Sequence, residues 1–297
     1  MSLVINHNMM AMNATRNLNA SYSNLATSVR RLSSGLRVGQ ASDDAAGLAI
    51  RELMRADIAS LNQGVRNAND AISMIQTADG ALGVIDEKLI RMKELAEQAA
   101  TGTYNSDQRL MIESEYQAMA SEITRIANAT DFNGVHLLNG NLSSDTHNGE
   151  GLVSEGKMKI HFGTGNDSAE DYYYIQIGNA TASALGVGNQ ASTDMGAYTV
   201  STQAAAQRAV ASINEAIISK DKIRAHLGAM QNRLENTISN LQIQAENMQA
   251  AESRISDVDV ATEMTEFVRN QVLTQAAVAM LSQANSLPQM AMQLIGG

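Results

Sequence analysis

Side chains that could bind a metal ion or catalyse a reaction are few in this sequence and poorly spaced for either task. The five histidines never lie four residues apart, and none belongs to the His-Glu-x-x-His pattern that places two zinc ligands on one helix face. Cysteine is absent, which excludes thiolate metal sites and disulfides. We therefore expect no metal site and no cofactor.

Three other patterns could carry chemistry. Asp43 and Asp44 are adjacent at an expected helix start and point in different directions, so helix capping is favoured over paired acid–base catalysis. Gly163-Thr164-Gly165 is too short for a phosphate-binding loop. The run Tyr172–Tyr174 could stack on a ligand, although a strand that alternates between core and surface is favoured. We find no catalytic set and expect the protein not to be an enzyme.

The composition favours helices packed on helices. Of the 297 residues 44% are hydrophobic but only 3% are aromatic, and Pro288 is the single proline. Thin cores of Leu, Ile, Val, Met and Ala suit long helices that few prolines interrupt. The N-terminus lacks the basic lead and apolar core of a signal peptide, and no apolar run has membrane-spanning length. We expect no membrane partner.

The net charge of −10 argues against nucleic-acid binding, and its distribution is uneven. Residues 1–41 contain four arginines and no acid, whereas residues 252–297 contain five acids and two arginines. The two ends could attract each other within or between subunits, or could be unrelated solvated faces.

Heptad spacing organises the N-terminal half. Val4, Ala11, Leu18, Leu25 and Leu32 lie seven apart, with Val29 in a second row, which predicts a coiled-coil helix. A joint follows. We expect two glycines that end the first helix, with an arginine between them, and then a serine that caps the next helix and two acids in its first turn. These residues are Gly35, Arg37, Gly39, Ser42, Asp43 and Asp44.

A second helix is predicted from Ser42 to Ala100 by another heptad row that includes Leu61, Ile75 and Leu89. Asn105 and Gln108 form a capping pair that predicts the start of a third helix. Beyond Thr130 the pattern changes, and two Asn-Gly pairs between residues 131 and 140 predict a hairpin.

Alternating apolar residues predict two strands, one around Ile160 and one around Ile175. Helical patterns return from Thr202 to Ile255 and from Asp259 to Leu294, and Leu273, Met280 and Leu287 lie on one stripe of the last helix. The fold class we expect is mainly α, with long antiparallel helices, a terminal coiled coil and a small β-hairpin region in the middle.

Several of these stretches resemble bacterial flagellins. They are Leu32–Arg37 (LSSGLR) with Asp43–Ile50 (DDAAGLAI), the run Ser253–Glu263, the stretch Gln283–Gln289, and the hairpin entry Phe132–Gly134. They follow the family's order at both ends of the chain, while the middle resembles the family only loosely.

The resemblance implies a secreted, extracellular subunit that polymerises into the flagellar filament. Three parts are expected. Residues 1–41 and 257–297 would form a terminal coiled-coil domain in the filament's inner core, packed through Leu18, Leu25, Val29, Leu32, Leu273, Met280 and Leu287. Residues 42–140 and 202–256 would form a long-helix domain. Residues 141–201 would be a short β-rich segment attached to it, with no separate outer domain.

The implied partners are further copies of the chain, the flagellar export apparatus with its chaperone, and the hook-associated junction and cap proteins. The stretch 89–98 also resembles the flagellin segment read by the host flagellin-sensing Toll-like receptor, which contacts the neighbouring subunit as well. Its candidate contact residues are Arg91, Lys93, Glu94, Leu95 and Gln98. Lys93 stands where the best-known recognised flagellins have arginine, so the forked donor geometry is lost. On physical grounds alone, this stretch could also be a solvated helix face.

Two other functions fit part of the pattern. The related hook–filament junction protein shares terminal helices of this kind, although the match over Leu32–Ile50 favours a flagellin. A cytosolic coiled-coil adaptor would explain the heptads but not the pattern over Gln283–Gln289.

Overall fold

The computed structural model describes residues 7–148, 155–168, 170–190 and 198–295. The chain forms two compact units. Unit 1 comprises Met1–Ile58 and Glu246–Gly297, and unit 2 comprises Ala59–Ala245. The borders between the units fall inside two long helices, α2 (Ala45–Ala100) and α5 (Gln203–Ser256). The three-part division drawn from the sequence stays a prediction about functional domains.

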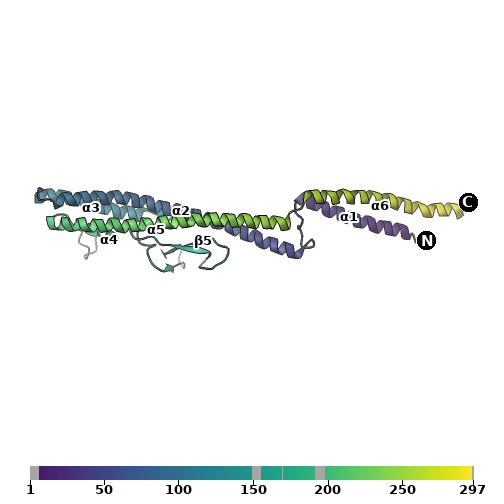
Figure 1. Cartoon of the computed structure of the whole chain (residues 1–297), viewed down its shortest axis with the longest axis horizontal. Coiled ribbons are helices and arrows are strands. Elements are labelled where there is room, and N and C mark those ends of the chain that lie inside the picture. The colour runs from purple at the N-terminus through teal and green to yellow at the C-terminus, as the bar shows by residue number, and fades with distance from the viewer. Residues whose placement is uncertain (1–6, 149–154, 169, 191–197, 296–297) are drawn as a thin grey trace. The chain divides into compact units, whose positions relative to one another are not determined.

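Unit 1 is built on an antiparallel pair of helices, α1 (Met9–Ser34) and α6 (Val260–Ile295), which lie side by side in Figure 1. Near one end of the pair, the Asn8 amide donates to the Ala284 carbonyl at 2.7 Å. The other Asn8 side-chain atom, Oδ1, accepts from the Ala11 N–H and so caps α1. Pro288 lies within α6. Val4, the first residue of the predicted heptad row, lies outside the described residues.

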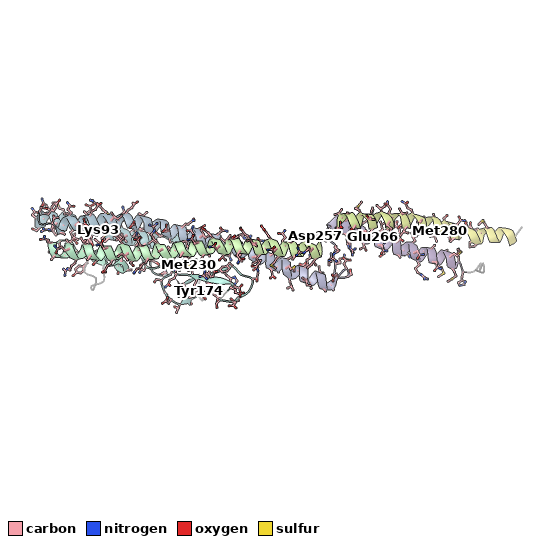
Figure 2. All side chains as sticks on the ribbon, in the orientation of Figure 1. Lys93, Tyr174, Met230, Asp257, Glu266 and Met280 are labelled. Atoms are coloured by element: carbon pink, nitrogen blue, oxygen red, sulfur yellow. The ribbon has the colours of Figure 1, made fainter. Side chains whose placement is uncertain are left out.

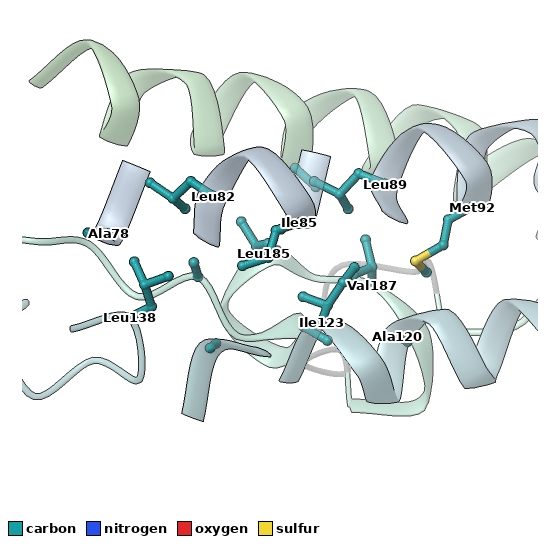
Figure 3. Packing of buried hydrophobic residues seen from close by; sticks show 14 of the residues in the cluster. Ala78, Leu82, Ile85, Leu89, Met92, Ala120, Ile123, Leu138, Leu185 and Val187 are labelled. Carbon is teal, nitrogen blue, oxygen red and sulfur yellow. The ribbon is translucent and has the colours of Figure 1, made fainter. Parts of the chain in front are cut away.

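Unit 2 is a bundle of the remaining parts of α2 and α5 with α3 (Ser106–Ala129). The predicted heptad residues of α2 are buried, and Ile75 and Leu89 belong to the core cluster of unit 2, as does one face of α3. Figure 3 shows Leu82, Ile85 and Leu89 of α2 and Ile123 of α3 in the same buried cluster. The Asn105–Gln108 capping box is present at the start of α3, as predicted.

Three two-stranded antiparallel sheets lie within unit 2. They are β1 (Asp131–Phe132) with β2 (Val135–His136), β3 (His147–Asn148) with β4 (Glu155–Gly156), and β5 (Met158–His161) with β6 (Tyr172–Ile175). The first is the predicted hairpin, and its turn places Asn133 and Gly134 at positive φ. The third pairs the two predicted strands, with Ile160 opposite Tyr173.

The segment after the third helix adds to the core of unit 2. Its buried residues include Leu142, Ile175, Ile177, Leu185 and Val187, all in the same cluster as the helices. A short helix α4 (Ala182–Leu185) carries Leu185, and Val187 lies between α4 and a 3₁₀ turn η1 (Gly188–Gln190).

The end of the β5–β6 hairpin is seated on α2 at Gly64. A β-carbon at Gly64 would lie 2.1 Å from the Phe162 carbonyl oxygen, so only glycine permits this approach. One turn to either side, the Ser60 hydroxyl donates to the Gly163 carbonyl at 3.4 Å and the Asn67 amide donates to the His161 carbonyl at 2.8 Å.

Side chains of α3 form hydrogen bonds with the backbone of η1 and of residues 198–200. Gln117 accepts from the Asn189 N–H at 2.7 Å and donates to the Tyr198 carbonyl, and Glu113 accepts from the Val200 N–H. Tyr116 is fully buried between them, and burial raises the pKa of its hydroxyl well above the usual value. No helix in the described ranges is long and apolar enough to cross a membrane.

Candidate functional site

The joint in unit 1 consists of the two chain segments that connect the terminal pair to the long helices, residues 35–44 and 257–259. The segments are hydrogen-bonded to each other. Arg37 N–H donates to the Ser256 carbonyl at 2.7 Å, Val258 N–H donates to the Gly35 carbonyl at 3.0 Å, and Leu36 pairs with Asp257 in an antiparallel bridge. The two connections therefore form a short ribbon rather than two independent linkers.

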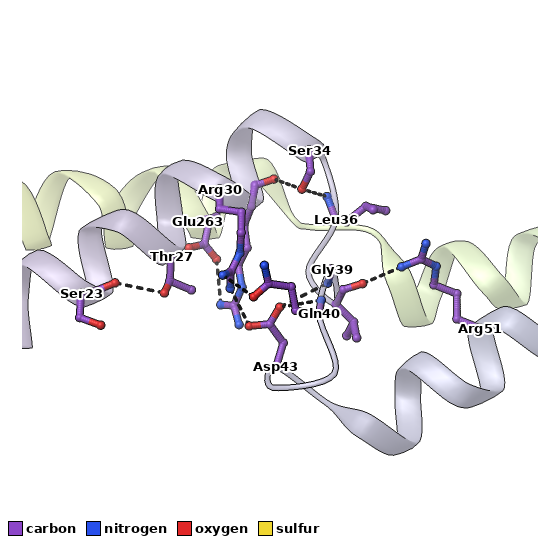
Figure 4. A network of polar contacts seen from close by, with 12 residues as sticks. Ser23, Thr27, Arg30, Ser34, Leu36, Gly39, Gln40, Asp43, Arg51 and Glu263 are labelled. Carbon is purple, nitrogen blue, oxygen red and sulfur yellow. Dashed lines mark hydrogen bonds and ion pairs between the residues drawn. The ribbon is translucent and has the colours of Figure 1, made fainter.

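Arg30 folds the first connection back toward α1. Its guanidinium donates to the Gln40 amide oxygen at 2.9 Å and to Asp43 at 2.8 Å (Figure 4). The second oxygen of Asp43 accepts from the backbone of Gly39 and Gln40. This carboxylate thus organises the loop ahead of α2 instead of lying in the helix's first turn.

Arg51 anchors the loop from the other side and is 8% exposed. One of its terminal nitrogens donates to the Val38 carbonyl at 2.8 Å, and its Nε lies 3.7 Å from Glu252 of α5. Val38 is itself buried. The sequence reasoning assigned no role to Arg51 or Glu252, although Arg51 directly follows the Asp43–Ile50 stretch.

Of the two interpretations of the uneven charge, attraction between the chain ends is supported by one ion pair within the chain. Arg31 of α1 lies 3.6 Å from Glu263 of α6, and Arg37 donates to the Ile255 carbonyl at 2.6 Å. Because Arg30 contacts its own joint, only part of the N-terminal positive charge faces the C-terminal helix.

Three predicted roles in the joint are wrong, because Ser42 is not the cap, neither Asp43 nor Asp44 lies in the first turn of α2, and Gly39 ends no helix. Asp44, not Ser42, accepts from the Gly47 N–H at 2.9 Å, and α2 begins at Ala45. Gly35 ends α1 in the left-handed conformation with φ 72°, as predicted, but Gly39 lies in the loop and ends no helix. The contact between Arg30 and Asp43 fixes the loop so that the cap falls on Asp44.

A groove of about 690 Å³ runs between α1 and α6. Its walls include the apolar residues Met10, Leu273 and Met280 and the polar residues Asn13 and Asn270. Small side chains such as Ala14, Ala20, Ala276 and Ala277 leave it open. The side chains of α1 and α6 therefore do not fill the space between the two helices.

The predicted terminal packing residues are only partly covered in the single chain. Leu18, Leu25 and Leu32 are half-buried. Val29, Leu273 and Met280 are exposed, Met280 by 62%, so their predicted packing is not made within one chain (Figure 2). The side chain of Leu287 lies outside the described residues. More exposed apolar residues occupy the same pair of helices, namely Met9, Met12, Tyr22, Val260, Met264, Val268, Val272, Val278 and Met290.

The stretch 89–98 presents a polar surface on α2, here called the α2 patch. Arg91 makes ion pairs with Glu94 at 2.9 Å and with Glu115 of α3 at 2.7 Å. Gln98 donates to the Tyr104 hydroxyl at 3.0 Å, and Lys93 is half-buried. Leu95 does not belong to this surface, because it is 1% exposed and packs in the core three residues after buried Met92.

Two ion pairs connect α2 and α5 within unit 2. The Lys220 ammonium is buried and lies 2.6 Å from Asp86, while Arg224 contacts Asp79 at 2.7 Å. The hydrogen bond from Arg224 holds the pKa of Asp79 below its usual value. Sequence patterns did not reveal these pairs, since each partner comes from a different helix.

Further aromatic and histidine side chains lie on the small sheets β3–β4 and β5–β6. His161 stacks with Tyr172, and His147 contacts the ring of Tyr174. Tyr173 packs on Phe162 from the opposite face of its strand, which confirms the predicted alternation. Within the described ranges, no three His, Cys, Asp or Glu side chains gather closely enough to hold a metal ion.

Comparison with known proteins matches both ends of the chain. Residues 5–143 match the family model of the bacterial flagellin N-terminal helical region, and residues 210–295 match that of the C-terminal helical region.

Individual relatives match along the whole length. A flagellar filament 33 kDa core protein of Treponema phagedenis is 42% identical over 99% of this chain and 100% of its own. A flagellin of Bacillus subtilis is also 42% identical, over 98% of this chain and 99% of its own. The structure of a putative flagellar hook-associated protein from Vibrio parahaemolyticus is 14% identical, with a TM-score of 0.54 over 72% of this chain and 100% of that one. That likeness concerns the fold alone.

Proposed function

This chain belongs to the bacterial flagellin family, and from that premise we propose that the terminal pair α1–α6 is the surface through which its copies assemble. The protein is a structural subunit of the bacterial flagellar filament, which lies outside the cell and drives swimming. The full-length relatives carry the names of flagellins and filament core proteins, so neither a junction protein nor a cytosolic adaptor is favoured.

The observation that carries the proposal is the amount of apolar surface left in contact with water on α1 and α6. Valines and methionines follow α6 from Val260 to Met290, and the groove beside them is unfilled. Isolated apolar side chains at a surface are ordinary, whereas so many exposed apolar side chains on one pair of helices indicate a partner.

A second copy of the same helix pair can bury these side chains. Each buried Val, Leu or Met side chain contributes about 1.5–3 kcal/mol when it leaves water. Packing through many copies would join the terminal helices into a continuous inner wall. The filament would then be held by non-covalent helix packing that transmits motor torque along its length.

The α2 patch is a second proposed contact with the neighbouring subunit. Arg91 is already held in position by Glu94 and Glu115, so less of its side-chain entropy is lost on contact. Recognition by the host flagellin-sensing Toll-like receptor is proposed for the same surface. Lys93 supplies a positive charge there without the two-pronged donor geometry of arginine.

The other proposed partners follow from family membership. They are the flagellar export apparatus with its chaperone, and the junction and cap proteins at the filament's two ends. We propose no catalytic activity, no cofactor, and neither nucleic acid nor membrane as a partner.

The test is the variant Val272→Asp in the purified full chain. Val272 is 58% exposed, so the charge should leave the free subunit folded while blocking seeded polymerisation. The matched control Val272→Thr keeps the branched shape without a charge and should polymerise. Sedimentation and electron microscopy measure polymer, and circular dichroism measures folding. Normal filaments from Val272→Asp would contradict the proposed surface.

A further inference from the structure

Exposed methionines are concentrated on the terminal helix pair. The chain has 17 methionines. The exposed ones on α1 and α6 are Met9, Met10, Met12, Met264, Met280 and Met290, here called the terminal methionines. In unit 2, by contrast, Met74, Met92 and Met230 are buried, and Met111 is the exposed methionine among its described residues. The side chains that oxidise most readily on exposure therefore lie on the surface proposed for assembly.

Two of the terminal methionines line the groove, one from each helix. Met10 of α1 and Met280 of α6 both line the groove, together with Leu273 and several alanines. An unbranched thioether adapts its shape to such an irregular apolar space. A sulfoxide in the same place is polar and strongly hydrated. Asn13, Arg269 and Asn270 also line the groove, but an exposed sulfoxide would still lose its water when a second copy covers the groove.

We propose that the terminal methionines are oxidation sites through which peroxide blocks the free subunit from assembling. The sulfur lone pair attacks one peroxide oxygen, the O–O bond breaks, and sulfoxide and water are formed from thioether and hydrogen peroxide. Sulfur loses two electrons and the peroxide gains them. The inference rests on the proposed assembly surface.

The effect is specific to assembly because these side chains face water in the free subunit. Adding an oxygen to an exposed sulfur leaves the core of either unit unchanged. Assembly would carry the same sulfoxide into an apolar contact, where its hydration is lost. Polymerisation would in turn cover the sulfurs, so the filament would resist the oxidation that inactivates its precursor.

The first experiment uses the wild-type full chain. Free subunits are treated with hydrogen peroxide, each methionine is followed by peptide mass spectrometry, and seeded polymerisation is measured by sedimentation. We expect sulfoxide at the terminal methionines well before Met74 and Met92, at least a tenfold loss of polymer, and recovery after treatment with the two methionine sulfoxide reductases, one for each epimer. Oxidised subunits that polymerise normally, or terminal methionines that oxidise no faster than Met74, would overturn the inference.

The second experiment locates the sites. For a variant with leucine at all six positions, the amount of polymer is compared with and without peroxide in the same variant. Peroxide should not lower it, because leucine has a similar volume and no sulfur. The control Met111→Leu replaces the most exposed methionine of unit 2, which is 73% exposed, and should stay sensitive. Sensitivity in the six-leucine variant would overturn the assignment, and if that variant fails to fold, the wild-type reductase experiment decides.

The third measurement compares free and assembled subunits. Each terminal methionine should oxidise at least tenfold more slowly in the filament, and equal rates would contradict the inference. Failure of the proposed function looks different, because Val272→Asp would then polymerise normally without any oxidant.

Discussion

Arg51 and Arg55 both approach Glu52, at 3.3 and 3.6 Å, yet their surroundings differ. Arg51 is buried and donates to the Val38 carbonyl, whereas Arg55 is largely exposed. Lysine keeps the positive charge but cannot reproduce the guanidinium's fork. The variant Arg51→Lys should therefore weaken the joint by about 1–3 kcal/mol.

The measurement is hydrogen exchange at the Arg37 and Val258 amides, which donate across the joint. The control Arg55→Lys should change the free energy of opening by less than about 0.5 kcal/mol, as expected for an exposed ion pair. An equal effect of the two variants would show that the buried fork is not what holds the loop.

Asp259 caps the start of α6. Its carboxylate accepts from the Thr262 hydroxyl at 2.8 Å and from the Ala261 N–H at 3.0 Å. These bonds to Thr262 and Ala261 hold its pKa below 3.8. Because the folded pKa is lowered, the stabilisation is complete above the unfolded value and is lost as the pH falls through the folded one.

We expect an NMR titration of the Asp259 carboxyl carbon to show a midpoint below 3.8. The variant Asp259→Asn keeps an acceptor oxygen but removes the titration, so protection of the first turn of α6 should no longer change over this range. A wild-type midpoint at or above 3.8 would contradict the capping role.

Single-residue roles were the hardest part to predict from sequence. Ser42, Asp43 and Asp44 are all good capping residues in a row, and the choice among them depends on Arg30, which approaches from a different helix. Leu95 is a different case, since its spacing from Met92 and Leu89 already placed it on the buried face of α2.

At the scale of elements, two glycines of α2 should respond to alanine in opposite ways. Gly80 has no atom within 4 Å of an added β-carbon, so Gly80→Ala should stabilise unit 2 by about 0.5–1 kcal/mol through helix propensity. Gly64→Ala gains the same propensity but clashes with the Phe162 carbonyl, and should destabilise it.

Thermal unfolding by circular dichroism distinguishes the two, with a higher midpoint for Gly80→Ala and a lower one for Gly64→Ala. Hydrogen exchange at the β5–β6 pairing should also rise in Gly64→Ala alone. A higher midpoint in both variants would mean that the hairpin end can move away from α2 at little cost.

The terminal helices should be ordered by assembly. Each presents apolar side chains that its partner helix in the same chain leaves exposed, so α1 and α6 draw little stability from packing in the free subunit. Their amides should exchange quickly in the free subunit and slowly in the filament, while residues 50–95 of α2 stay protected in both. Equal protection of α1 and α6 in the two states would refute this coupling.

The long helices were predictable because their core contacts repeat every seven residues. The observed bounds of α2, α3, α5 and α6 lie within a few residues of the predicted ones. The pair β3–β4, the short helix α4 and η1 were not predicted. Each is only two to four residues long, too short for a repeating pattern, and is fixed by contacts with α3 and with distant backbone.

For the whole chain, the middle segment bears on the appearance of the filament. Described residues of 141–201 place Leu142, Ile177 and Leu185 in the core shared with the helices. About 60 residues that contribute to another core are too few to build a second one. We expect a comparatively smooth, narrow filament in electron cryomicroscopy, and density for a separate domain projecting beyond the β1–β2 hairpin would contradict this.

The ribbon at the joint decides how a load passes through the terminal unit. One connection joins α1 to α2 and the other joins α5 to α6, and the bonds from Arg37 to Ser256 and from Val258 to Gly35 fasten them together. A pulling force on either terminal helix is then shared by two covalent connections. Neither connection can lengthen alone without breaking the hydrogen bonds between them. The joint therefore resists tension through two hydrogen-bonded chain segments at once, which suits a subunit under mechanical load in a rotating filament.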